Sequence, residues 1–176
     1  MHQSIINFTN IQNSIKENQE KTNNKNNIKI IAVSKTFEIS HINPLIDYGH
    51  TDFGENKVQE AIEKWSDIKH KNQNLSLHLV GKLQSNKTKL ALKIFDYIHS
   101  LDSEKLANKI SEEQKKIDKK PKLFIQVNIG NEDQKSGVNP NNLKSFYKYC
   151  LNKDLDVIGT MCLPPISEDP EKYFMR

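Results

Sequence analysis

Short segments rich in β-branched residues alternate along the chain with segments whose apolar residues recur at helical spacing. The first short segment, residues 28–34 (IKIIAVS), is a nearly continuous apolar run, typical of a strand covered on both faces of a parallel sheet. Further along, Val58, Ala61 and Trp65 share one face of a predicted helix. This alternation predicts an α/β fold with a parallel sheet.

Six strands separated by helices are predicted in this way. The strands cover residues 28–34, 51–53, 75–80, 96–99, 122–128 and 155–160, and the helices cover 3–20, 40–48, 56–69, 84–94, 103–118 and a segment that begins at Asn139 and Pro140. Residues 1–27 are expected to form an N-terminal helix and a polar loop, and residues 28–176 the main domain, so that the chain is effectively a single domain.

Two arrangements of a parallel sheet are open at this point, a doubly wound sheet and a (β/α) barrel. The sequence SKTFEI after the first strand lacks the glycines of a dinucleotide-binding turn, which disfavours a Rossmann sheet. In a barrel, functional residues lie at the carboxyl ends of the strands. The strand ends are therefore where candidate site residues should be sought.

The composition narrows the classes of function. The 176 residues carry a formal net charge of +4 and include only one arginine, Arg176. Because arginine is the preferred side chain for bidentate recognition of phosphates and bases, a sequence-specific nucleic-acid partner is not expected. The sequence holds no apolar stretch of membrane-spanning length and no secretory signal, so no membrane partner and a cytoplasmic location are predicted. Cys150 and Cys162 are expected to be buried and unpaired.

Lys35 directly follows the first strand and is the most specific chemical candidate among the strand ends. Desolvation lowers the pKa of a lysine that emerges from a buried strand and frees its amine for Schiff-base chemistry. Lysine is so abundant here, however, that some strand ends should hold one by chance. The histidines have no metal-ligand spacing, and His78, within a strand, is by itself expected to be a satisfied interior histidine. Glu55 and Asp102 are isolated carboxylates, expected to act as helix caps or first-turn residues.

Read together, the strand ends form an ordered series of motifs. These are AVSKT at 32–36, FGENKVQEA at 53–61, HLVGKLQSNK at 78–87, LDS at 101–103, QVNIGNEDQKSGV at 126–138 and GTM at 159–161. In order and spacing they resemble the pyridoxal phosphate homeostasis protein family (YggS type), over about residues 28 to 165. Each motif alone is weak, but the ordered series is specific.

The resemblance implies an alanine-racemase-like barrel that binds pyridoxal 5′-phosphate (PLP). It implies that Lys35 holds PLP as a Schiff base, that Asn56 lies close to the cofactor and that His78 and Met161 line the same pocket. Family members bind PLP and help to control its supply, so the implied function is PLP homeostasis without robust catalysis, with PLP-dependent apoenzymes as possible recipients. The alternatives are a racemase-like PLP enzyme, which would need a second base, and a nonfunctional remnant.

The sequence also departs from the family pattern. The segment GTMCLPP stands where the family usually has a sequence closer to GLMAIPP. Family members continue beyond the match through strands seven and eight, which supply much of the phosphate-binding site. The resulting expectation is a (β/α)8 TIM-type barrel that is truncated, with about six strands present, and that is monomeric if it folds.

Overall fold

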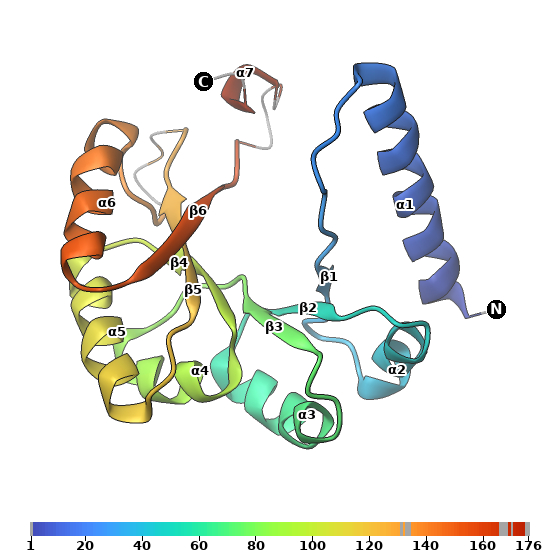
Figure 1. Ribbon diagram of the computed structural model, residues 1–176, viewed down its shortest axis with the longest axis horizontal. Coiled ribbons are helices and arrows are strands. Elements are labelled where there is room, and N and C mark those ends of the chain that lie inside the picture. The colour runs from blue at the N-terminus through green and yellow to red at the C-terminus, as the bar shows by residue number, and fades with distance from the viewer. Residues whose placement is uncertain (1, 131, 133–134, 166–168, 170, 175–176) are drawn as a thin grey trace.

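Six parallel strands form one sheet in the computed structural model, which describes residues 2–130, 132, 135–165, 169 and 171–174 (Figure 1). The strands are β1 (Ala32–Val33), β2 (Asp52–Glu55), β3 (Ser76–Leu79), β4 (Tyr97–Leu101), β5 (Lys122–Val127) and β6 (Asp156–Cys162). The helices are α1 (Gln3–Thr22), α2 (Ile39–Asp47), α3 (Val58–Lys71), α4 (Thr88–Ile94), α5 (Glu104–Ile117), α6 (Leu143–Asn152) and α7 (Glu171–Phe174), with short 3-10 turns η1 (Ser85–Lys87) and η2 (Pro140–Asn142).

The strands lie side by side in the order in which they occur in the sequence, from β1 to β6, and all neighbours pair in parallel. A doubly wound sheet reverses its strand order at a switch point, whereas a (β/α) barrel adds each strand beside the previous one. The α/β prediction is therefore confirmed, and the order of the strands is that of a barrel.

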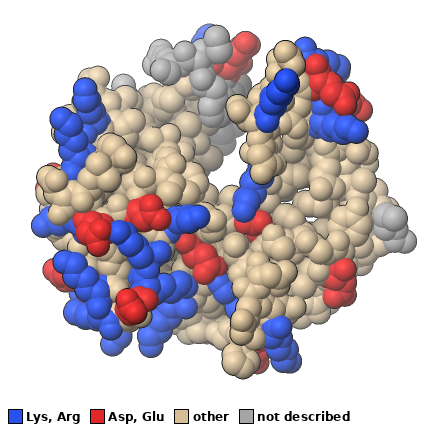
Figure 2. Space-filling view, in the orientation of Figure 1, with Lys and Arg blue, Asp and Glu red and all other residues tan. Residues whose placement is uncertain are grey.

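The sheet is open between its first and last strands. Among the described residues β1 and β6 are the two edges, and Figure 1 shows them apart from each other, with β6 left of centre, beside α6, and β1 right of centre. The space-filling view in Figure 2 shows the surface hollowed between the part of the chain that holds β6 and the part that holds α1 and β1. The described strands thus form a six-stranded sheet with the strand order of a barrel, and this sheet does not close on itself.

Residues of the two faces of the sheet differ in chemistry. One face carries Phe53, Leu77 and Ile98, each no more than 1% exposed, and Phe53 packs on Trp65 of α3 with 4.9 Å between ring centroids. This is the face covered by helices, where burying a large apolar side chain contributes about 1.5–3 kcal/mol. The other face, toward the interior of the open barrel, carries the polar residues Asp52 and His78.

The first strand is much shorter than predicted. The expectation of a strand over 28–34 covered on both faces was wrong, because only Ala32 and Val33 form ladder pairs and Ile28 is 47% exposed. As an edge strand β1 has a single neighbour, β2, so an apolar run alone did not reveal how much of it is paired. The other predicted strands and helices lie within a few residues of their observed positions.

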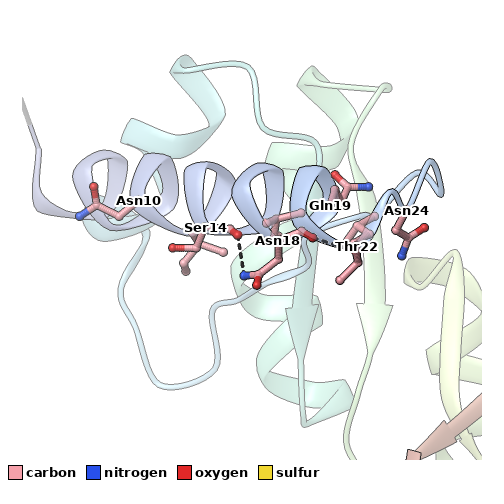
Figure 3. A pocket seen from close by; sticks show the side chains of 9 residues that line it. Asn10, Ser14, Asn18, Gln19, Thr22 and Asn24 are labelled. Atoms are coloured by element: carbon pink, nitrogen blue, oxygen red, sulfur yellow. Dashed lines mark hydrogen bonds between the residues drawn. The ribbon is translucent and has the colours of Figure 1, made fainter. Parts of the chain in front are cut away.

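The N-terminal helix touches the rest of the molecule at few points. Its one buried residue is Phe8, whose ring centroid lies 4.6 Å from that of His50. Along its exposed side runs a shallow groove of about 360 Å³, in which Ser14, Asn18 and Thr22 stand at successive turns (Figure 3). There the Asn18 amide donates to the carbonyl of Ser14 and the Thr22 hydroxyl to that of Asn18. These polar groups therefore bond to their own helix.

Surface lysines are abundant but interspersed with carboxylates. Figure 2 shows lysines gathered over α4 and α5, with acidic side chains between them. On α5 the buried carboxylate of Glu113 accepts hydrogen bonds from Lys109 at 3.0 Å and from Lys116 at 2.9 Å. Much of this basic surface therefore serves to pair carboxylates. No helix among the described residues is long and apolar enough to cross a membrane.

The two cysteines are free, but they differ in burial. Cys150 is fully buried on α6, and burial raises the pKa of its thiol to about 11. Cys162, at the end of β6, is only partly buried. The prediction that both would be buried is thus confirmed for Cys150 and wrong for Cys162, because β6 is an edge strand with no neighbour on its other side among the described residues.

Candidate functional site

Lys35 lies in the turn that follows β1, with its side chain exposed. Because Val33 pairs with Gly54, Lys35 and Asn56 stand two residues beyond paired positions of neighbouring parallel strands. Both therefore lie at the carboxyl end of the sheet, as predicted for functional residues of a barrel. Within the described part of the chain, the amine of Lys35 takes part in no hydrogen bond or ion pair.

Asn56 carries an unpaired polar atom. Its side-chain oxygen is buried and has no hydrogen-bond partner among the described residues. An unsatisfied buried acceptor costs about 1–3 kcal/mol, a cost that a water molecule or a polar ligand group bound there would remove. The carbonyl of Asn56 also closely approaches Gly81, where an added Cβ would come within 2.2 Å of it. Only glycine fits at this point, which brings the ends of β2 and β3 together.

His78 lies deeper in the barrel than Lys35 and has both ring nitrogens engaged. One nitrogen is 3.1 Å from the Asp52 carboxylate, the other is 2.9 Å from His99, and the ring stacks on Tyr97. Burial lowers the pKa of His78, and the bond to Asp52 opposes that effect only in part. Burial, and next the neighbouring His78, lowers the pKa of His99 to about 4. Both rings are therefore neutral at neutral pH, and the expectation of a satisfied interior histidine is confirmed.

Met161 lies on the opposite edge of the sheet from Lys35. It is a half-buried residue of β6 and pairs with Gln126 of β5. The structure thus brings Lys35 and Asn56 to adjacent strand ends, places His78 within the interior of the same face of the sheet and puts Met161 on the far strand. The position of Met161 in a cofactor pocket stays a prediction.

Glu55 is a residue whose role sequence reasoning missed. The expectation of a helix cap or first-turn residue was wrong, because Glu55 is the last residue of β2 and is fully buried. One of its carboxylate oxygens accepts hydrogen bonds from Ser34 (2.8 Å), Lys64 (2.9 Å) and Trp65 (3.0 Å). A signal was present in the sequence, since the indole N–H of a buried tryptophan needs an acceptor close by.

The other oxygen of Glu55 is buried and has no hydrogen-bond partner in the part of the chain that the structure describes. The Glu55 side chain lies on the face of the sheet that α3 covers, as that of Phe53 does, so this acceptor is not on the same side as the interior residues Asp52 and His78. The described residues contain no group of three or more histidine, cysteine or carboxylate side chains that could hold a metal ion. The unpaired amine of Lys35 and the buried oxygen of Asn56, at adjacent strand ends, suit an organic ligand that carries a polar group and a centre that reacts with an amine.

Comparison with known proteins gives consistent matches. The family described as "Alanine racemase, N-terminal domain" matches residues 6–176. The chain is 38% identical to the pyridoxal phosphate homeostasis protein of Pasteurella multocida, over 91% of this chain and 68% of that protein. It is 40% identical to the protein of the same name from Haemophilus influenzae, over 83% of this chain and 62% of that protein. The chain thus spans about two thirds of the length of these relatives.

A solved structure of PipY from Synechococcus elongatus, with PLP bound, resembles the fold with a TM-score of 0.72 and 32% sequence identity. The similarity covers 89% of this chain and 73% of PipY.

Proposed function

This chain belongs to the pyridoxal phosphate homeostasis protein family, and we propose that it binds PLP covalently through the amine of Lys35. The Lys35 nitrogen forms a C=N bond with the aldehyde carbon, and the aldehyde oxygen leaves as water, which gives a Schiff base. The observation that carries the proposal is the position of this amine, unpaired among the described residues, at the carboxyl end of a barrel strand. The PLP bound in the PipY structure supports it.

The residues around Lys35 fit such a ligand. The buried side-chain oxygen of Asn56 is free to accept a hydrogen bond and stands on the adjacent strand. His78 and Met161 are proposed to line the pocket from β3 and β6, with His78 contributing a neutral ring whose orientation is fixed by Asp52 and His99. When bound, PLP supplies an electron sink for reactions at the α-carbon of amino acids. The residues around it determine whether such a reaction follows.

We propose that the chain serves PLP homeostasis in the cytoplasm rather than catalysis, and that PLP-dependent apoenzymes receive the cofactor. Racemisation of an amino acid needs a second base, besides Lys35, positioned on the opposite face of the cofactor. His78 has both nitrogens engaged by Asp52 and His99, which leaves it poorly suited to that role. Binding without turnover is therefore the function that the described residues support best. Exposure to amino acids in heavy water tests this, since α-proton exchange would indicate a racemase-like enzyme instead.

The binding itself is tested with two matched lysine variants. PLP added to the wild-type chain should produce an absorbance band at about 420 nm. Lys35→Ala should abolish this band, whereas Lys57→Ala, which removes another exposed lysine close by in the sequence, should leave it unchanged. A wild-type spectrum without the band would contradict the proposal, as would a band of equal strength in Lys35→Ala.

A further inference from the structure

The residue before Lys35 is held by the strand and helix next to it. The N–H of Ser34 donates to the carbonyl of Gly54 at 2.8 Å, and its hydroxyl donates to the carboxylate of Glu55, also at 2.8 Å. The carbonyl of Ser34 accepts a hydrogen bond from the amine of Lys64 at 3.0 Å. Ser34 is 5% exposed, and each of its polar groups has a protein partner. The backbone on the N-terminal side of Lys35 is therefore fixed.

The residue after Lys35 is held in a strained conformation. Thr36 has a φ of 66°, in the left-handed region, which is sterically unfavourable for a non-glycine residue and rare for a β-branched one. Its N–H donates to the carboxylate of Glu60 on α3 at 3.1 Å. That hydrogen bond is the main cause that lowers the pKa of Glu60. Strain of this kind persists where surrounding contacts impose it, and it concentrates at functional sites.

One lysine of α3 links the carboxylate that binds Ser34 to the carboxylate that binds Thr36. Lys64 lies 2.9 Å from Glu55 and 3.5 Å from Glu60, with only 12% of its side chain exposed. Replacing a buried ion pair by well-packed apolar residues is often neutral or stabilising. Stability alone therefore does not account for the pair of Glu55 and Lys64. Both members of this ion pair also bind Ser34, the residue before Lys35, so the pair fixes the backbone at the end of β1.

We infer that Glu55, Glu60 and Lys64 are positioning residues that set the direction in which Lys35 leaves the end of β1, an inference that rests on the proposed function. They fix the backbone on both sides of Lys35, at Ser34 and Thr36, and leave the side chain of Lys35 itself unbound. An amine presented in a defined direction loses less freedom when it reacts. Residues that hold the backbone beside a functional side chain determine how precisely that side chain is positioned.

Glu60 offers the sharpest test because it lies near the surface, so that replacing it should not unfold the chain. Glu60→Ala removes the acceptor for Thr36, and we expect PLP to bind about tenfold more weakly, as measured by titration at 420 nm. Glu60→Gln keeps an oxygen that can accept the same hydrogen bond and should recover most of the affinity. Glu63→Ala removes an exposed carboxylate of the same helix and serves as the control.

Equal PLP affinity in the wild type and in Glu60→Ala would overturn the inference while leaving the proposed function intact. A second measurement, hydrogen exchange at the Thr36 amide, does not depend on PLP. We expect this amide to be protected in the wild type and in Glu60→Gln but to exchange faster in Glu60→Ala. If the wild type binds no PLP, the proposed function is wrong. In that case only the exchange rate of the Thr36 amide tests whether Glu60 fixes the backbone beside Lys35. Equal exchange rates in the wild type, Glu60→Gln and Glu60→Ala would overturn the inference.

Discussion

The buried carboxylate of Glu55 accepts a hydrogen bond from the hydroxyl of Ser34 at 2.8 Å, which ties the end of β2 to the residue before Lys35. The same oxygen binds Lys64 and Trp65 of α3, so one carboxylate joins two strand ends and the helix that follows. The geometry of the proposed PLP site therefore depends on a contact that lies outside the pocket itself.

Glu55→Gln should destabilise the fold strongly. The substitution removes the buried counter-charge of Lys64 and leaves its ammonium group only the partly exposed carboxylate of Glu60 at 3.5 Å. Breaking a buried ion pair typically costs about 3–5 kcal/mol, and the remaining contact with Glu60 should offset part of this loss. The double variant Glu55→Gln with Lys64→Met should recover much of this loss, because the largely buried ammonium group is then gone and the carboxylate left without it, Glu60, is partly exposed. Unfolding in urea measures both free energies. A loss of less than about 1 kcal/mol in the single variant would contradict the account.

Asn56→Ala should lower the affinity for PLP without a large change in the free energy of unfolding. The side-chain oxygen of Asn56 is buried without a partner among the described residues, so its removal loses no hydrogen bond there. We expect the free energy of unfolding to stay within about 1 kcal/mol of the wild type, while the affinity for PLP falls. Urea unfolding and PLP titration check the two halves of this prediction. Unchanged affinity would show that Asn56 does not contact the cofactor.

Gly81→Ala should disrupt the junction between β2 and β3. An added Cβ would lie 2.2 Å from the carbonyl oxygen of Asn56, a backbone atom that cannot move aside cheaply. Overpacking of this kind typically costs about 1–3 kcal/mol or more. Gly159→Ala is the matched control, since its nearest neighbour is a side-chain atom of Phe124 at 3.1 Å. Equal losses of thermal stability in the two variants would be the contrary result.

Acid should weaken the fold through His99. Its pKa is about 4 in the folded chain, below the ordinary value of 6.5, so between these values the unfolded chain binds more protons than the folded one. Stability is therefore fully present above pH 6.5 and is lost as the pH falls through this window, by up to about 3 kcal/mol.

His99→Phe should flatten this part of the pH profile and can still stack on Phe124, whose ring centroid lies 4.3 Å from that of His99. Some slope should remain, because burial also lowers the pKa of His78. His70→Phe, at an exposed position of α3, should keep the full slope. Identical urea-unfolding profiles for His99→Phe and the wild type would rule out His99 as the cause.

The sequence allowed the order of strands and helices to be predicted because their apolar spacing is local information. The stripe of Val58, Ala61 and Trp65 marks α3 without any knowledge of its neighbours, and all three residues are buried as predicted. The extent of β1 could not be predicted in this way, since pairing depends on which strands lie beside it. Strand periodicity also gave no reason to choose Lys35 among so many lysines. That choice depended on the ordered motifs.

The contacts of Glu55 could not be predicted from local sequence patterns either, because its partners are distant in the sequence. Its partners Lys64 and Trp65 lie nine and ten residues further along the chain. They reach the carboxylate only because α3 folds back against the end of β2. The third partner, Ser34, comes from the adjacent strand end, 21 residues earlier. A carboxylate at a strand end therefore looked like a helix cap until the packing of α3 was known.

The central claim, that Lys35 carries PLP, is tested most directly by trapping the bond. Borohydride delivers hydride to a C=N bond and converts it into a stable amine, so digestion and mass spectrometry can locate the modified lysine. We expect the phosphopyridoxyl group on Lys35 at a stoichiometry near one per chain, and little on the other lysines. Modification spread evenly over exposed lysines, or absent from Lys35, would contradict the account.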